Sequence, residues 1–140
     1  MAGLILNLRP WETFLVGEHV LQNGPKKTQL RVPDEGAKVL RQSDALHPDQ
    51  VSTPVTRAYY TAQLLVLGLT EEGPGKGALC HLLRQLKEAL GERAEAAAAL
   101  TLALEGRYYL VLRQLKKLLP EEALLLSAQH HQREQLARAC

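Results

Sequence analysis

The side chains best suited to chemistry in this chain are basic and aromatic residues at helical spacing. Tyr109, Arg113 and Lys116 follow one another at positions i, i+4 and i+7, with Lys117 beside them, so they share one face of a helix. Such a cationic strip with an aromatic ring can contact phosphates and stack a base. An ordinary solvated helix face is the competing interpretation, and the spacing alone favours it.

A second set of basic residues lies in the first third of the chain. Arg9, Arg31 and Arg41 each fall in or beside an expected strand, and Lys26 and Lys27 follow an expected turn. Strand arginines can reach the phosphates and base edges of single-stranded RNA. They are also common as plain surface residues, and the pattern by itself favours that simpler interpretation.

Residue sets for catalysis or metal binding are not found in the sequence. The glycines and lysine of residues 73–77 have no strand before them and no Ser or Thr after the lysine, so we predict a flexible linker there and not a phosphate-binding loop. The histidines and cysteines lack the spacing of a four-ligand metal site. We expect a protein that is not an enzyme and that uses no metal and no cofactor.

Composition limits the partners and the compartment. The 140 residues carry a formal net charge of only +2, so any nucleic-acid binding must rest on a local patch and not on a global field. The two cysteines, Cys80 and Cys140, lie far apart, which indicates a reducing compartment. No apolar run has the length of a signal peptide or a membrane span. We therefore expect a cytoplasmic protein without a membrane partner.

The first 45 residues have the pattern of a small antiparallel β module. Leu4, Leu6 and Leu8 alternate with other residues, as in a strand with one buried face. Gly17-Glu18 and Asn23-Gly24-Pro25 are turn signals. About five short strands are predicted, at residues 4–8, 13–16, 19–22, 29–32 and 38–41.

Residues 46–140 have the apolar spacing of helices. Thr53-Pro54 is a helix start, because a hydroxyl caps the first turn and the missing N–H of proline costs nothing there. About four helices are predicted, near residues 54–69, 79–90, 93–105 and 108–119, with Pro120 closing the last and a frayed tail from about residue 122.

Together these patterns predict an α+β fold in one compact domain. The β module is too small to offset its chain entropy alone. It must therefore pack on the helices of its own chain or pair with a second copy, which would make the protein a homodimer.

Four stretches resemble the FlbT family of flagellar post-transcriptional regulators. They are "LNLRPWETFLVG", "VLRQSDAL", "TPVTRAYYTAQLLVL" and "GRYYLVLRQLKKLLPEE". The third is the most specific, with Thr53-Pro54, Arg57, Tyr59-Tyr60 and Gln63-Leu64. In this motif Tyr59 lies on the apolar stripe and is expected in the core, with its hydroxyl reaching a partner. Tyr60 and Arg57 are candidate contacts to RNA.

The N-terminal segment is also similar to the carbon storage regulator CsrA, a small RNA-binding β protein. The likeness covers the first apolar strand, Arg9, Glu12-Thr13 and the triplet Phe14-Leu15-Val16 before Gly17. In that family the first strand and an arginine after the last strand grip RNA in a strand-swapped dimer, which implies such a role for Arg41. Two departures stand out: Leu8 precedes Arg9 where a basic pair is typical, and Trp11 stands where a glycine is usual.

The resemblance to FlbT implies a regulator that binds the 5' untranslated leader of flagellin messenger RNA and alters its translation and degradation, usually as a repressor. A flagellar regulator of the FlaF type is an implied protein partner. The alternative hypothesis is a protein–protein adaptor in flagellar regulation that does not contact RNA. The near-neutral charge and the missing basic pair favour this alternative.

Overall fold

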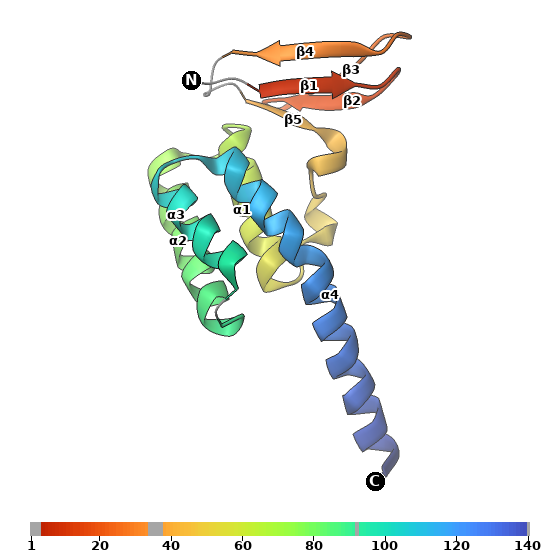
Figure 1. Ribbon diagram of the computed structural model, residues 1–140, viewed down its shortest axis with the longest axis vertical. Coiled ribbons are helices and arrows are strands. Elements are labelled where there is room, and N and C mark those ends of the chain that lie inside the picture. Colours follow the sequence, from red (N-terminus) through yellow and green to blue (C-terminus); the bar gives the residue numbers. More distant parts are fainter. Residues whose placement is uncertain (1–3, 34–37, 92, 140) are drawn as a thin grey trace.

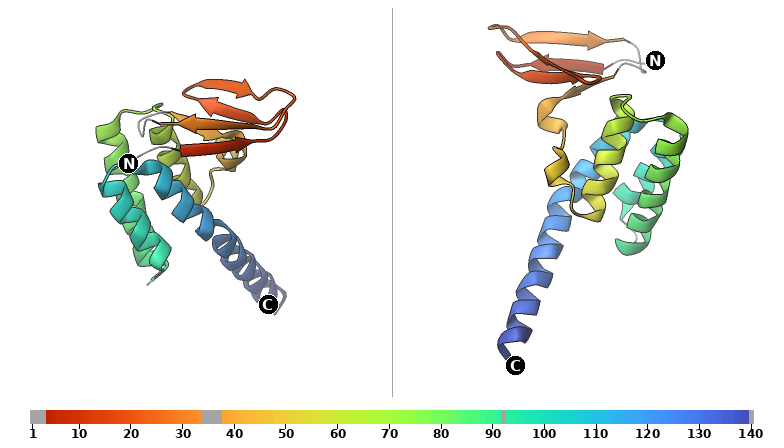
Figure 2. Two further views of the ribbon diagram at one scale, coloured as in Figure 1. Left: turned by 45° about the horizontal axis from the view of Figure 1, so that its top comes forward. Right: turned by 180° about the vertical axis from the view of Figure 1, so that it is seen from behind.

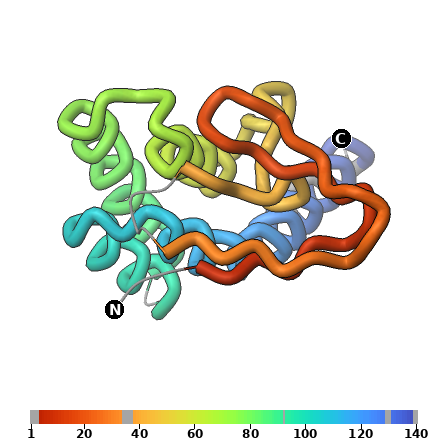
Figure 3. The backbone as a smooth tube through the Cα atoms, turned by 90° about the horizontal axis from the view of Figure 1, so that it is seen from above, coloured from red at the N-terminus to blue at the C-terminus, as the bar shows by residue number. Residues whose placement is uncertain are grey.

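The computed structural model describes residues 4–33, 38–91 and 93–139. Within these ranges, five short antiparallel strands lie across one end of a bundle of four α-helices (Figures 1 and 3). The predicted α+β class and the small antiparallel module that precedes the helices are confirmed.

The five strands form two small sheets. In the first, β1 pairs with β4, and in the second β2 lies between β3 and β5. Each strand begins and ends within a residue of its predicted position, because alternation and turn residues are local signals. The bounds are β1 Leu4–Leu8, β2 Thr13–Val16, β3 His19–Gln22, β4 Thr28–Val32 and β5 Val39–Arg41.

Strand alternation sends apolar side chains to two different cores. Leu6 and Leu8 of β1 pack against Phe14 of β2 and Val39 of β5, in the space between the sheets. Leu40 is the next residue of β5, so it points the other way and joins the apolar core of the helices. The β module is therefore attached to the helices through the outer face of its second sheet.

The four helices form a ring in which each helix contacts two others. α1 and α3 each lie between α2 and α4. Leucines at steps of three and four, such as Leu79 and Leu83 of α2, are fully buried, as the apolar periodicity predicts. The bounds are α1 Pro54–Val66, α2 Glu72–Ala89, α3 Ala94–Leu104 and α4 Tyr108–Ala139, with short 3₁₀ turns η1 Gln42–Asp44 and η2 Pro48–Gln50 in the preceding linker.

The predicted linker at residues 73–77 is wrong, because these residues form the first turns of α2. Pro74 is tolerated there, since amide groups in the first turn of a helix have no partner within that helix. Gly75 is buried, and a Cβ atom at this position would lie 2.7 Å from Cδ2 of Leu65. The glycine thus allows α2 to approach α1 closely.

The prediction that Pro120 ends the last helix is also wrong. α4 continues through Pro120 to Ala139 and projects away from the bundle (Figure 1). An internal proline costs about 3 kcal/mol, but contacts fix the helix on both sides of it. Leu118 is buried, and the carboxylate of Glu122 accepts hydrogen bonds from the hydroxyl of Thr53 (2.5 Å) and the N–H of Val55 (3.0 Å) at the start of α1. In the part of the chain that the structure describes, no helix is long and apolar enough to cross a bilayer.

The linker after β5 leads from the strands to the start of α1 (Figure 2). Two side chains of the "TPVTRAYYTAQLLVL" motif hold it on α1. The amide of Gln63 accepts from the N–H of Leu46 (2.7 Å) and donates to its carbonyl (3.0 Å). The hydroxyl of Tyr59 donates to the carbonyl of Asp44 (2.5 Å), and burial raises the pKa of this hydroxyl. The prediction that Tyr59 is a core residue with a partnered hydroxyl is confirmed.

We predict that Gln63→Leu destabilises the protein by roughly 2–4 kcal/mol, because both backbone groups of Leu46 lose their partner in a partly buried place. Denaturant unfolding followed by circular dichroism measures this change. Thr61→Ala is the matched control: its hydroxyl bonds only to a carbonyl of the same helix at an exposed place, so the loss should stay below about 1 kcal/mol. Equal, small losses for both variants would contradict this role of Gln63.

Candidate nucleic-acid interface

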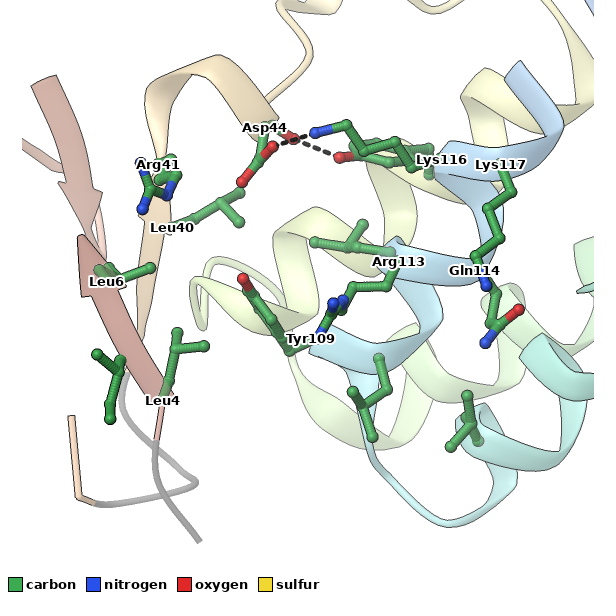
Figure 4. Close-up of a pocket in the computed structure, with 15 residues that line it drawn as sticks. Leu4, Leu6, Leu40, Arg41, Asp44, Tyr109, Arg113, Gln114, Lys116 and Lys117 are labelled. Atoms are coloured by element: carbon green, nitrogen blue, oxygen red, sulfur yellow. Dashed lines mark hydrogen bonds and ion pairs between the residues drawn. The ribbon is translucent and has the colours of Figure 1, made fainter. Parts of the chain in front are cut away.

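A cleft of about 820 Å³ separates the β module from α4 (Figure 4). Residues of β1 and β5, with Asp44 of η1, form one wall, and residues of α4 form the other. This volume lies within the range of small-ligand sites. Among the residues singled out from the sequence, five line this cleft: Arg41, Tyr109, Arg113, Lys116 and Lys117.

The two walls differ in chemical character. On the β side the accessible lining is the apolar pair Leu4 and Ile5, and the buried side chains of Leu6 and Leu40 lie beneath it. From α4, Tyr109 and Arg113 point toward β1, whereas Lys117 lies on the outer side of the helix near Gln114 (Figure 4). The arrangement can pack a planar base against apolar groups and present cations to its phosphate.

The side chain of Arg41 makes its hydrogen bonds within the protein. Its guanidinium donates to the carboxylate of Glu12 (2.8 Å) and to the carbonyl of Asn7 (2.7 Å). The side chains of Arg41 and Glu12 are only 24% and 16% exposed. Because Asn7 belongs to the first sheet and Arg41 to the second, this arginine clamps the two sheets together. The resemblance to CsrA implied that Arg41 binds RNA. In this structure its guanidinium instead makes hydrogen bonds within the protein.

Lys116 is also paired. Its ammonium group forms an ion pair with the carboxylate of Asp44, which connects α4 to the linker after β5 (Figure 4). This pair closes the end of the cleft that lies next to η1. In contrast, no ion pair joins Arg113 or Lys117 to any residue of the described ranges. Both are exposed, so they are the cations of the cleft that remain available to an anionic ligand.

Arg31 lies close to the cleft through the register of the first sheet. It pairs with Ile5, which lines the cleft. Residues opposite each other in adjacent strands project from the same face. The exposed side chain of Arg31 therefore projects from the outer face of the first sheet, opposite to Leu4 and Leu6, and does not itself line the cleft.

The remaining strand cations gather at the far end of β1. The side-chain amide of Asn23 donates to the carbonyls of both Arg9 (2.8 Å) and Lys26 (2.9 Å). These two hydrogen bonds connect the corner after β1 to the turn before β4. Arg9, Lys26 and Lys27 are therefore close together and exposed, and we call this region the tip. The two candidates on α1, Arg57 and Tyr60, do not line the cleft.

One residue at this tip was not among the candidates from the sequence. Trp11 has a φ of 63°, and its side chain is exposed. This left-handed conformation favours glycine, and a bulky aromatic residue rarely adopts it. The sequence contained one indication of this site. Trp11 is the only tryptophan of the chain, and the resemblance to CsrA predicted a glycine at its position.

The described residues hold no group of three or more His, Cys, Asp or Glu side chains that could bind a metal ion.

Comparisons with known proteins agree on one family. Residues 4–126 match the family model described as flagellar protein FlbT. A probable flagellum biosynthesis repressor protein FlbT of Rhodopseudomonas palustris is 31% identical over 126 residues, which cover 89% of this chain and 98% of that protein. The flagellum biosynthesis repressor protein FlbT of Caulobacter vibrioides is 38% identical over 64 residues, 46% of this chain and 45% of that protein. No solved structure matches the chain.

The ion pair between Arg41 and Glu12 predicts that the free energy of unfolding depends on pH. The N–H of Arg9 donates to the Glu12 carboxylate, and together with Arg41 it holds the pKa of Glu12 below 4.5, although burial opposes this effect. A carboxyl whose pKa is lowered on folding stabilises the protein above its unfolded pKa. This contribution disappears as the pH falls from about 4.5 through the folded value.

We therefore expect Glu12→Gln to lower the melting temperature at about pH 7, and the gap from wild type to narrow toward about pH 3. Thermal unfolding scans between about pH 3 and pH 7 measure this difference in melting temperature. Glu18→Gln is the control, because Glu18 is 77% exposed and does not contact Arg41. A gap between wild type and Glu12→Gln that stays constant with pH would show that the charge of Glu12 does not support the clamp.

Proposed function

Because this chain belongs to the FlbT family of flagellar proteins, we propose that it is a post-transcriptional regulator of flagellum biogenesis that binds the 5' untranslated leader of flagellin messenger RNA. By holding the leader it alters translation and degradation of the message. Relatives named as flagellum biosynthesis repressors support regulation in the negative direction.

The observation that carries this proposal is the cleft between β1 and α4. Its α4 wall offers Tyr109 and Arg113, a cation without an ion pair among the residues that the structure describes, with Lys117 at the outer side. Its other wall is apolar and lies beside the open edge of β1. A single-stranded leader can place bases against such a wall while the cations contact its phosphates.

This mechanism needs no catalytic group. Occupancy of the leader by the protein competes with the ribosome or changes the conformation of the message. With a net charge of only +2, affinity comes from a few local contacts, so binding should weaken as salt concentration rises.

We predict that Arg113→Ala and Lys117→Ala each weaken binding to a flagellin leader RNA by roughly 1–3 kcal/mol. Each should also reduce the slope of log affinity against log salt by about one. Fluorescence anisotropy of the labelled leader at several salt concentrations measures both quantities.

Lys87→Ala is the control for this experiment, since Lys87 is an exposed residue of α2 that does not line the cleft. Its affinity and salt slope should match those of the wild type. Wild-type affinity for the Arg113 and Lys117 variants would exclude the cleft as the binding site. Failure of the wild type to bind the leader at low salt would exclude direct RNA binding.

A protein–protein adaptor is the second candidate function, and the projecting part of α4 favours it. Leu125 and Leu136 are 50% and 69% exposed. They lie eleven residues, or about three helical turns, apart and so share one face. Two exposed leucines on one face of a projecting helix are suited to docking on a partner protein, and a flagellar regulator of the FlaF type is the partner we propose to test.

For the adaptor function we expect Leu125→Glu with Leu136→Glu to abolish co-purification of the FlaF-type protein, because charges would replace the apolar contact. RNA affinity should not change, since both residues lie outside the cleft. Ser127→Ala, an exposed polar position of the same segment, is the control. Undiminished co-purification by the double variant would reject this helix face as the docking site.

A further inference from the structure

Trp11 is held in an unfavourable conformation with its indole in solvent. Its φ of 63° places a bulky residue in the left-handed region, which costs roughly 1–2 kcal/mol. Two hydrogen bonds enforce this conformation. The N–H of Trp11 donates to the carbonyl of Gly24 (3.0 Å), and its carbonyl accepts from the side-chain amide of Gln22 (3.1 Å).

The strain is not offset by burial of the ring. The residue is 60% exposed, so the indole gains only a small part of the stabilisation that a buried tryptophan would provide. Strained backbone that is fixed by its surroundings is concentrated at functional sites. An exposed aromatic ring on a rigid backbone is a ready surface for a planar ligand.

The charges around the ring indicate the kind of ligand. Arg9, Lys26 and Lys27 are exposed, and no ion pair joins them to residues of the described ranges. The nearest acid in the sequence, Glu12, already accepts hydrogen bonds from Arg41 and from the N–H of Arg9. The tip is therefore cationic, with one aromatic surface, and this combination matches a base together with its neighbouring phosphates.

We propose that Trp11 stacks on one base of a single-stranded RNA whose adjacent phosphates are contacted by Arg9, Lys26 and Lys27. This inference rests on the proposed RNA-binding function and adds a second contact point to it. β1 runs from the cleft at Leu4 to the tip at Arg9, about 17 Å at the usual rise of a strand. One extended RNA strand can follow β1 and occupy both places.

The fluorescence of Trp11 provides a direct test, because it is the only tryptophan of the chain. Titration with unlabelled flagellin leader RNA should quench this fluorescence saturably, through stacking of the indole on a base. Inorganic polyphosphate has charge but no bases, so it should compete for the tip without quenching. Anisotropy of labelled leader RNA measures binding independently of the tryptophan.

Two substitutions separate stacking from folding. Trp11→Asn removes the ring but tolerates the left-handed conformation, so its melting temperature should equal or exceed that of the wild type. Its affinity for the leader should fall about 5- to 150-fold, the range for loss of one stacked base. Trp11→Tyr keeps a ring for stacking and should recover most of the affinity.

The outcomes of this experiment are distinct. Saturable quenching, weak binding by Trp11→Asn and recovery by Trp11→Tyr support the proposal. If anisotropy shows binding while Trp11 fluorescence and the affinity of Trp11→Asn are unchanged, the stacking role is overturned and the proposed function stands. If the wild type does not bind the leader at low salt, the proposed function fails and this inference fails with it.

Discussion

The fold depends on the hydrogen bonds that side chains of α1 make to the backbone of the linker after β5. Gln63 makes two hydrogen bonds to the backbone of Leu46, and Tyr59 makes one to the backbone of Asp44. A two-stranded and a three-stranded sheet have little stability as isolated units. Here they cover each other's apolar faces, and the fixed linker places them against the helices. The width of the cleft beside α4 follows from this attachment.

The cations of the chain divide into two groups with different tasks. Arg41 joins the two sheets, and Lys116 joins α4 to the linker, so both stabilise the walls of the cleft. Arg113 in the cleft and the three cations of the tip have no ion pair among the described residues. A chain with almost no net charge can therefore still present local positive surfaces, and the sum over the whole sequence says little about them.

Local signals in the sequence predict much of this fold, and contacts between distant residues account for what they miss. Alternating leucines and turn residues place all five strands. Gly75 looks like a helix breaker because its contact with Leu65 cannot be seen in the sequence. Pro120 looks like a helix end because the hydrogen bonds of Glu122 to the start of α1 are equally hidden.

The candidate site follows the same rule. Helical spacing correctly groups Tyr109, Arg113 and Lys116 along the cleft, since these residues share one helix face. Spacing cannot show that Lys116 and Arg41 have partners within the protein, because Asp44, Glu12 and Asn7 meet them only in the folded chain. The exposed ring of Trp11 also becomes significant only when its backbone conformation is known.

The most direct test of the account is a map of the amide groups that a flagellin leader RNA protects from hydrogen exchange in the full chain. If RNA binds in the cleft between the β module and α4, protection should increase in β1 and in α4 around Tyr109 to Lys117. α2 and α3, which do not form the walls around these residues apart from Leu102, should exchange as in the free protein. Protection confined to α2 and α3, with β1 and α4 unchanged, would contradict the account.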